Sequence, residues 1–66
     1  MEVIINGLRR PIADGATVAE AVRLITAETS GVAAAVNDEV VSRAAWTTTR
    51  VAEGDRVEVL TAVQGG

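Results

Sequence analysis

The sequence predicts an α+β fold, in which a mixed sheet of four to five strands carries one main helix across one face. Short apolar runs separated by turn residues indicate strands, and only one stretch shows apolar residues at helical spacing. The 66 residues suffice for a single domain, over residues 1–66, with a small core. Because one helix covers only one face of a sheet, the other face should stay partly open.

The first two strands are predicted to form a hairpin. Residues 2–6 alternate in the manner of a strand, with Val3 and Ile5 on one face. Asn6-Gly7 is the dipeptide most typical of a two-residue hairpin turn. Residues 8–12 form the return strand, and Pro11 indicates that this strand lies at an edge of the sheet or ends early.

The one helix is predicted from Val18 to about Thr29. Thr17 and Glu20 have the spacing of a capping box, which satisfies free amide groups at a helix start. After Ser30, Gly31 supplies the left-handed residue that commonly ends a helix. Apolar residues at helical spacing form the expected buried stripe: Val18, Ala21, Val22 and Ile25, with Leu24 beside it.

The second half of the chain adds three more strands. The apolar run at 32–37 is typical of an interior strand, and the turn at 37–39 leads to a short strand at 40–41. Residues 43–50 are predicted to be irregular or a short helical turn, anchored on the core by Trp46, the only aromatic residue. A turn at 52–55 precedes the last strand, at 56–63.

This element order predicts a β-grasp arrangement, with the first and last strands side by side in the middle of the sheet. Val57 and Val59 then face the helix, and Ile4 and Leu60 lie on the open face. Exposed aliphatic side chains often mark a docking surface. Single surface aliphatics are also ordinary, so docking through Ile4 and Leu60 is a hypothesis.

Composition excludes several classes of function. The chain has no cysteine and no histidine, which excludes disulfides, zinc sites and thiolate or imidazole catalysis. A net charge of −3 argues against nucleic acid as a partner. No apolar run approaches the length of a membrane span and no signal peptide is visible, so we expect no membrane contact and a cytoplasmic protein.

No catalytic residues are predicted within the chain. Its serines have no histidine or lysine to activate them, since all six basic residues are arginine. Asp14, Glu53 and Asp55 fall in predicted turns, where carboxylates normally cap backbone amides.

The chain ends in two glycines, directly after the last predicted strand. By average glycine usage such an end arises by chance in roughly one chain in 200, so a frayed end without function is the alternative. A Gly-Gly end places an unhindered carboxylate at the tip of a thread that can enter a narrow active site. When extended, this tail reaches at most about 16–18 Å. It consists of Ala62, Val63, Gln64, Gly65 and Gly66.

The chain resembles the ThiS family, the sulfur carrier proteins of thiamine biosynthesis, over essentially its whole length. The family pattern has an Asn-led hairpin, two aliphatics, an arginine with a tryptophan three residues on, a Gly-Asp turn and a strand that ends in Gly-Gly. The matching residues are Asn37, Val40, Val41, Arg43, Trp46, Gly54, Asp55, Gly65 and Gly66.

The resemblance implies partners and a role for the terminus. A ThiF-type adenylating enzyme would dock on the open face and use ATP and Mg to convert the Gly66 carboxylate to an acyl-adenylate. Sulfur from a cysteine desulfurase or another persulfide donor would then give a thiocarboxylate, which thiazole synthase would consume. The chain itself would bind no cofactor and catalyse nothing.

Other functions remain open at this point. The small subunit of molybdopterin synthase and a sulfur carrier for cysteine synthesis share the Gly-Gly end. A ubiquitin-like tag would form an isopeptide bond instead of carrying sulfur. A β-grasp binding module would give the terminus no role.

Overall fold

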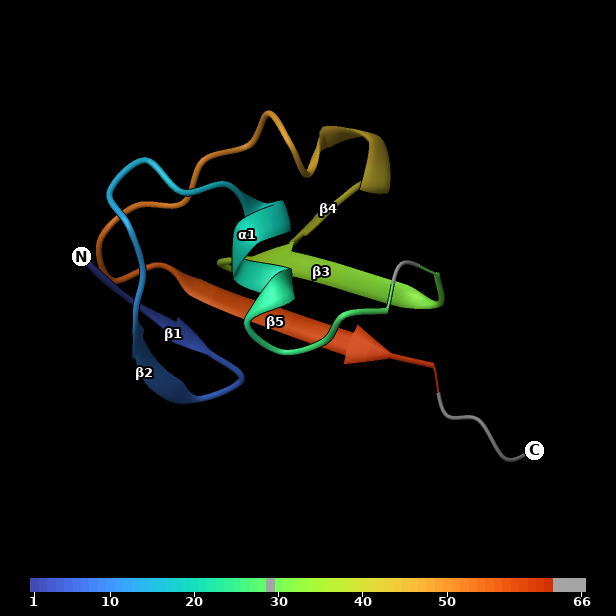
Figure 1. The fold of residues 1–66 in the computed structure, drawn as a ribbon, viewed down its shortest axis with the longest axis horizontal. Helices are drawn as coiled ribbons and strands as arrows, with labels where there is room; N and C mark the ends of the chain where they lie inside the picture. The colour runs from blue at the N-terminus through green and yellow to red at the C-terminus, as the bar shows by residue number, and fades with distance from the viewer. Residues whose placement is uncertain (29, 63–66) are drawn as a thin grey trace.

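The computed structural model describes residues 1–28 and 30–62, and it confirms the predicted α+β fold (Figure 1). Within them, five strands form one mixed sheet in the order β2-β1-β5-β3-β4, and α1 lies across one face. The elements are β1 (Glu2–Ile5), β2 (Leu8–Pro11), α1 (Val18–Arg23), β3 (Val32–Val36), β4 (Glu39–Val41), the 3-10 turn η1 (Arg43–Ala45) and β5 (Arg56–Thr61).

The first and last strands lie side by side, as predicted. β1 runs parallel to β5, with Ile4 opposite Arg56 and Ile5 opposite Val57. Every other pairing is antiparallel: β2 on β1, β3 on β5, and β4 on β3. β5 is therefore the middle strand of the sheet, and the proline-containing β2 lies at an edge.

Two hairpins have turns of the same type. Asn6 and Gly7 have φ angles of 51° and 84°, and Asn37 and Asp38 have 49° and 71°. Two consecutive positive φ angles define a type I′ turn, whose twist matches that of the flanking strands. Asparagine and aspartate tolerate this conformation better than most residues. The turns set which residues face each other across each hairpin.

The core lies between α1 and one face of the sheet. Val3, Ile5 and Val57 are fully buried, and Val59 nearly so, as predicted. The rest of the core consists of Ala16, Val18, Ala21, Val22, Ala34, Trp46 and Val51.

The helix begins where the sequence predicts and ends much earlier. The Glu20 amide donates to Thr17 Oγ1 at 3.3 Å. The Glu20 carboxylate accepts the Thr17 hydroxyl at 3.5 Å and not the Thr17 amide, so the capping box is only half formed. α1 then covers six residues instead of about twelve, and Leu24, expected in the buried stripe, is 45% exposed.

The early end of α1 has local causes. The Leu24 and Ile25 amides bond to carbonyls three residues back, which tightens the last turn. The Glu28 amide then donates to Thr26 Oγ1 at 3.0 Å, a side-chain bond that competes with helix continuation. Gly31 has the expected left-handed φ of 70°, but it leads into β3 and does not cap the helix. Thr29 lies outside the described residues.

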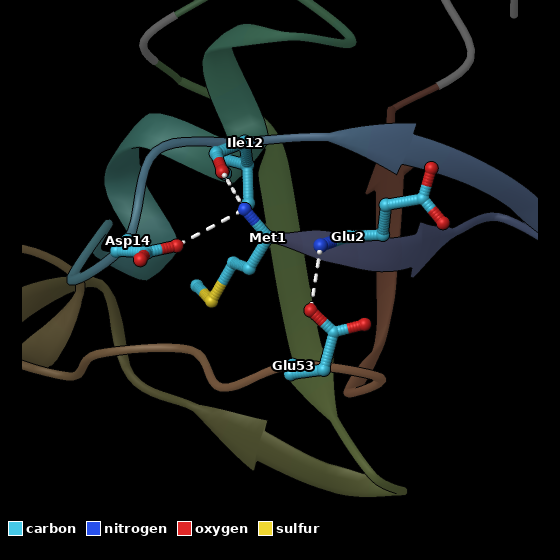
Figure 2. Close-up of polar contacts among 5 residues, drawn as sticks. All are labelled: Met1, Glu2, Ile12, Asp14 and Glu53. Atoms are coloured by element: carbon cyan, nitrogen blue, oxygen red, sulfur yellow. Dashed lines mark hydrogen bonds and ion pairs between the residues drawn. The ribbon is translucent and has the colours of Figure 1, made fainter.

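Polar groups fasten the open end of the β1–β2 hairpin, where β1 starts and β2 ends (Figure 2). The Met1 ammonium donates to the Ile12 carbonyl and to the Asp14 carboxylate, each at 3.0 Å. The Glu2 amide donates to Glu53 at 3.0 Å. Asp55 accepts the Ala52 amide at 2.7 Å. The three turn carboxylates therefore bind main-chain or terminal N–H groups, as the sequence predicts.

Trp46 is a core residue, as predicted. It is 6% exposed, and its Nε1 donates to the Val41 carbonyl at 2.9 Å. The guanidinium of Arg43 lies 4.8 Å from the ring centroid, within the range of a cation–π interaction. The main-chain carbonyl of Trp46 accepts the Ala19 amide, so the backbone of Trp46 bonds to α1 while its ring bonds to β4.

Replacing Trp46 with alanine should lower the free energy of unfolding by about 3–5 kcal/mol, the usual cost of truncating a buried aromatic residue. In a domain this small, that loss could unfold it. Urea denaturation followed by circular dichroism measures the change. Trp46→Phe is the matched control, which keeps a ring and loses mainly the bond to Val41, and it should cost about 1 kcal/mol. Unchanged stability in Trp46→Ala would show that the ring is not structural.

Candidate functional site

The site begins with β5, the strand that leads to the C-terminus (Figure 1). On the β1 side, the Ile4 amide donates to the Asp55 carbonyl and the Asn6 amide to the Val57 carbonyl, both at 2.9 Å. On the other side, β5 pairs with β3 from Val57 to Thr61. β5 is therefore paired with strands on both edges up to Val57, and its course sets the direction in which the chain leaves the sheet.

Two asparagine side chains add to this hold on β5. Asn6 Oδ1 accepts the Val59 amide at 2.8 Å, and Asn6 Nδ2 donates to the Val59 carbonyl at 3.2 Å. Near the start of the strand, Asn37 Oδ1 accepts the Arg56 amide at 3.0 Å. Each asparagine is the first residue of a type I′ turn, so one residue type both shapes the turn and bonds to the middle strand.

The predicted tail starts at a residue that still bonds to the sheet. The Ala62 amide donates to the Gly31 carbonyl at 2.7 Å. A Cβ placed on Gly31 would lie 3.2 Å from the Ala62 Cβ, so glycine at this position allows the close approach. Val63, Gln64, Gly65 and Gly66, the other predicted tail residues, lie outside the described residues.

Ile4 and Leu60 lie on the face of the sheet away from α1, as predicted. Leu60 is 70% exposed, whereas Ile4 is half-buried. Ile4 is opposite Arg56, four residues before Leu60 along β5, so the two positions are about 13 Å apart along the strand. They share a face but occupy different parts of it.

Leu60 belongs to an apolar patch. The sequence predicted the exposed position of Leu60 but not the residues beside it. Leu60 lies opposite Ala33, and Ala35 lies opposite Val40, which is 82% exposed. We call Ala33, Ala35, Val40 and Leu60 the Leu60 patch. The two alanines form its low floor, with the larger side chains at its sides, and Glu58, opposite Ala35, lines the same hollow. The two-residue turn at Asn37-Asp38 was the available signal, because it sets Val40 opposite Ala35.

Ile4 has charged neighbours instead. It lies between Arg9 and Arg56 in the register of the sheet. Arg9 pairs with Glu2 at 3.2 Å and Arg56 with Asp38 at 2.9 Å, both at exposed positions. The hydrogen bond that Arg56 donates to Asp38, together with the negative charge of that carboxylate, raises the pKa of Arg56 above its ordinary value. The open face therefore has an apolar part near the C-terminal end of β5 and a charged part near its start.

Residues 1–28 and 30–62 contain no group of three or more acidic, histidine or cysteine side chains placed to hold a metal ion. In the same residues, no helix is long and apolar enough to cross a membrane.

Comparisons with known proteins extend over the whole chain. A crystal structure of the thiamine biosynthesis protein ThiS from Geobacter metallireducens superposes with a TM-score of 0.81 and is 33% identical, with both chains fully covered. A solution structure of a thiamine biosynthesis protein from the same organism gives a TM-score of 0.80 at 33% identity, covering all of this chain and 88% of that one. No curated protein matches the chain.

The sequence of the chain also matches a protein family directly. A sequence model of the ThiS family aligns with residues 3–66, so it includes the two terminal glycines and all of the sheet except Glu2 at the start of β1. With the β-grasp fold and two solved structures in agreement, the chain belongs to the ThiS family.

Proposed function

We propose that the chain is a sulfur carrier of thiamine biosynthesis, with the Gly66 carboxylate as its reacting group. The observation that carries this proposal is the ThiS-family match, which runs through residue 66 on a fold whose middle strand leads to that terminus. The similar structures are described as thiamine biosynthesis proteins, which favours this pathway over molybdopterin or cysteine synthesis.

The proposed chemistry starts from the inertness of a carboxylate. A carboxylate is a poor electrophile, so a ThiF-type enzyme first joins the Gly66 carboxylate to the α-phosphorus of ATP and releases pyrophosphate. The terminal sulfur of a persulfide, supplied by a cysteine desulfurase or another donor, attacks the acyl carbon and displaces AMP. A second thiol then cleaves the resulting acyl disulfide and leaves a thiocarboxylate on Gly66, the sulfur source for thiazole synthase.

In this scheme the chain is a protein co-substrate and not an enzyme. Side chains at positions 65 and 66 would add bulk beside the reacting carbonyl, and glycine avoids this. Ordering each glycine in the partner's site costs on the order of 1–2 kcal/mol of backbone entropy. Docking of the folded domain must offset that cost. In this scheme ATP and Mg are used by the activating enzyme and not by the carrier, and the proposed location of the carrier is the cytoplasm.

The open face is the proposed docking surface, with the Leu60 patch as its centre. The patch adjoins the end of β5, and aliphatic side chains exposed together are typical of protein contacts. Ile4 lies on the same face but is half-buried between arginines, so we assign it a smaller contribution.

Changing the length of the terminus should abolish adenylation and leave the fold intact. Deleting Gly66 withdraws the carboxylate by about 3.3–3.6 Å, and adding one residue after it moves the carboxylate past the reacting position. Solvated terminal residues contribute little to stability, so thermal unfolding should change little. The measurements are pyrophosphate exchange with the purified activating enzyme and intact mass for the replacement of oxygen by sulfur.

Wild-type activity in the extended variant would refute the carrier mechanism and leave the binding-module interpretation. An isopeptide-linked product in place of a thiocarboxylate would indicate a ubiquitin-like tag.

Leu60→Glu should weaken binding to the activating enzyme by at least about tenfold, because it places a charge at the centre of an apolar contact. Val40→Glu should act in the same direction. Leu8→Glu is the matched control: Leu8 is 61% exposed, and it lies opposite Ile5, on the other face of the sheet. Isothermal titration calorimetry measures the affinities. Normal binding by a folded Leu60→Glu variant would exclude the open face as the docking surface, and unfolding of that variant would show that Leu60 belongs to the core.

A further inference from the structure

We infer that Asn6 is a positioning residue, whose side-chain amide fixes the direction in which the C-terminal tail leaves β5. The inference concerns a contact between residues 53 positions apart in the sequence. Its consequence for the reaction rests on the proposed function, whereas the contact itself can be tested on the free protein.

The Asn6 amide takes the place of a missing piece of strand. Pairing of β1 with β5 ends at Ile5 opposite Val57, because the chain turns back at Asn6-Gly7. The next main-chain groups of β5 on this edge are the amide and carbonyl of Val59, and both bond to the Asn6 side chain, at 2.8 and 3.2 Å. A carboxamide offers one acceptor and a donor on the same plane, so it can replace a peptide group here.

Asn6 is also the last support on this edge in the described part of the chain. Residues of β5 direct their main-chain groups alternately to the two neighbouring strands. Those of Thr61 point to the same edge as those of Val59, where β1 has already ended. Beyond Val59, the described hydrogen bonds of β5 go to β3 and to Gly31 only. The strand is thus held on two sides up to Val59 and on one side after it.

A strand held on one side can twist or peel away from its neighbour more easily than one held on both. Without the Asn6 bonds, the last residue of β5 that is held on the β1 edge would be Val57 instead of Val59. The tail would then start from a less defined direction, although the Leu60 patch and the terminus would be unchanged. We therefore expect an effect on the reaction of the docked complex and not on docking.

The chain provides a matched control for this test. Asn37 has the same left-handed conformation, at the same position of a type I′ turn, and also bonds to β5, but at Arg56 near the start of the strand. Glycine at either position keeps the turn and removes only the side-chain amide. Asn6→Gly and Asn37→Gly both make the unfolded chain more flexible. They differ in which end of β5 loses its side-chain hydrogen bonds.

The first measurement uses amide hydrogen exchange and ¹⁵N relaxation of the free proteins. In Asn6→Gly, exchange of the Val59 amide should become about tenfold faster, as the loss of two hydrogen bonds implies. The heteronuclear NOE of Thr61 and Ala62 should fall. In Asn37→Gly, these signals should match the wild type after correction for global stability. Asn6→Asp retains the acceptor for the Val59 amide, so that amide should exchange more slowly than in Asn6→Gly.

The second measurement is the steady-state kinetics of adenylation. Asn6→Gly should lower kcat about tenfold, the scale expected when a reacting group is misplaced. It should leave KM within about twofold, and Asn37→Gly should have near-normal kcat. An unchanged Val59 amide or an unchanged kcat in Asn6→Gly would overturn the inference, as would equal losses in both glycine variants. A wild-type protein that is not adenylated would refute the proposed function instead, and the exchange and relaxation data would then decide the role of Asn6 alone.

Discussion

The rest of the structure depends on a parallel pair of strands, β1 and β5, in the middle of the sheet. A parallel pair cannot be closed by a tight turn, so the 50 residues that separate Ile5 from Arg56 must supply the crossover, the helix and the remaining strands. Both strands present valines or isoleucine to α1. Among the described residues, the largest fully buried side chains are Val3, Ile5 and Val57 of these strands and Val18 of the helix. α1 packs on the apolar face of this pair, and β3 bonds to the other edge of β5.

The polar side chains of the loops serve this central pair. Asn6 and Asn37 bond to β5, Glu53 bonds to the start of β1, and Asp55 closes the turn that leads into β5. Main-chain groups near the middle of a sheet are costly to leave unpaired, and a domain of this size has little core to offset that cost. These four side chains therefore stabilise the backbone of the central pair.

Local signals predicted most of the fold. Asn6-Gly7, Asn37-Asp38 and the turn at 52–55 act within a few residues, and each appears where the sequence places it. The helix length could not be predicted in the same way, because the apolar pattern continues past Arg23. The tightened last turn and the bond from the Glu28 amide to Thr26, which accompany the end of α1, are not visible in that pattern. Leu60 was predicted on the open face, but its grouping with Val40 was not, although the Asn37-Asp38 turn indicates the register of Val40. The Asn6–Val59 contact was not predicted, because it joins residues 53 positions apart in the sequence.

The open face has a charged part and an apolar part, and the two parts would contribute differently to the binding of a partner. Near the start of β5 the charges of Arg9 and Arg56 are already paired with Glu2 and Asp38, and exposed ion pairs of this kind contribute little to affinity. Near the end of β5 the patch is apolar, with Glu58 as a charged neighbour on the same face. Apolar contact can therefore supply the affinity, and one acidic side chain beside it can favour a basic group on the partner. Leu60 of the patch and the last residues of β5 belong to the same strand. A partner that binds the patch therefore also fixes the position from which the C-terminal tail starts.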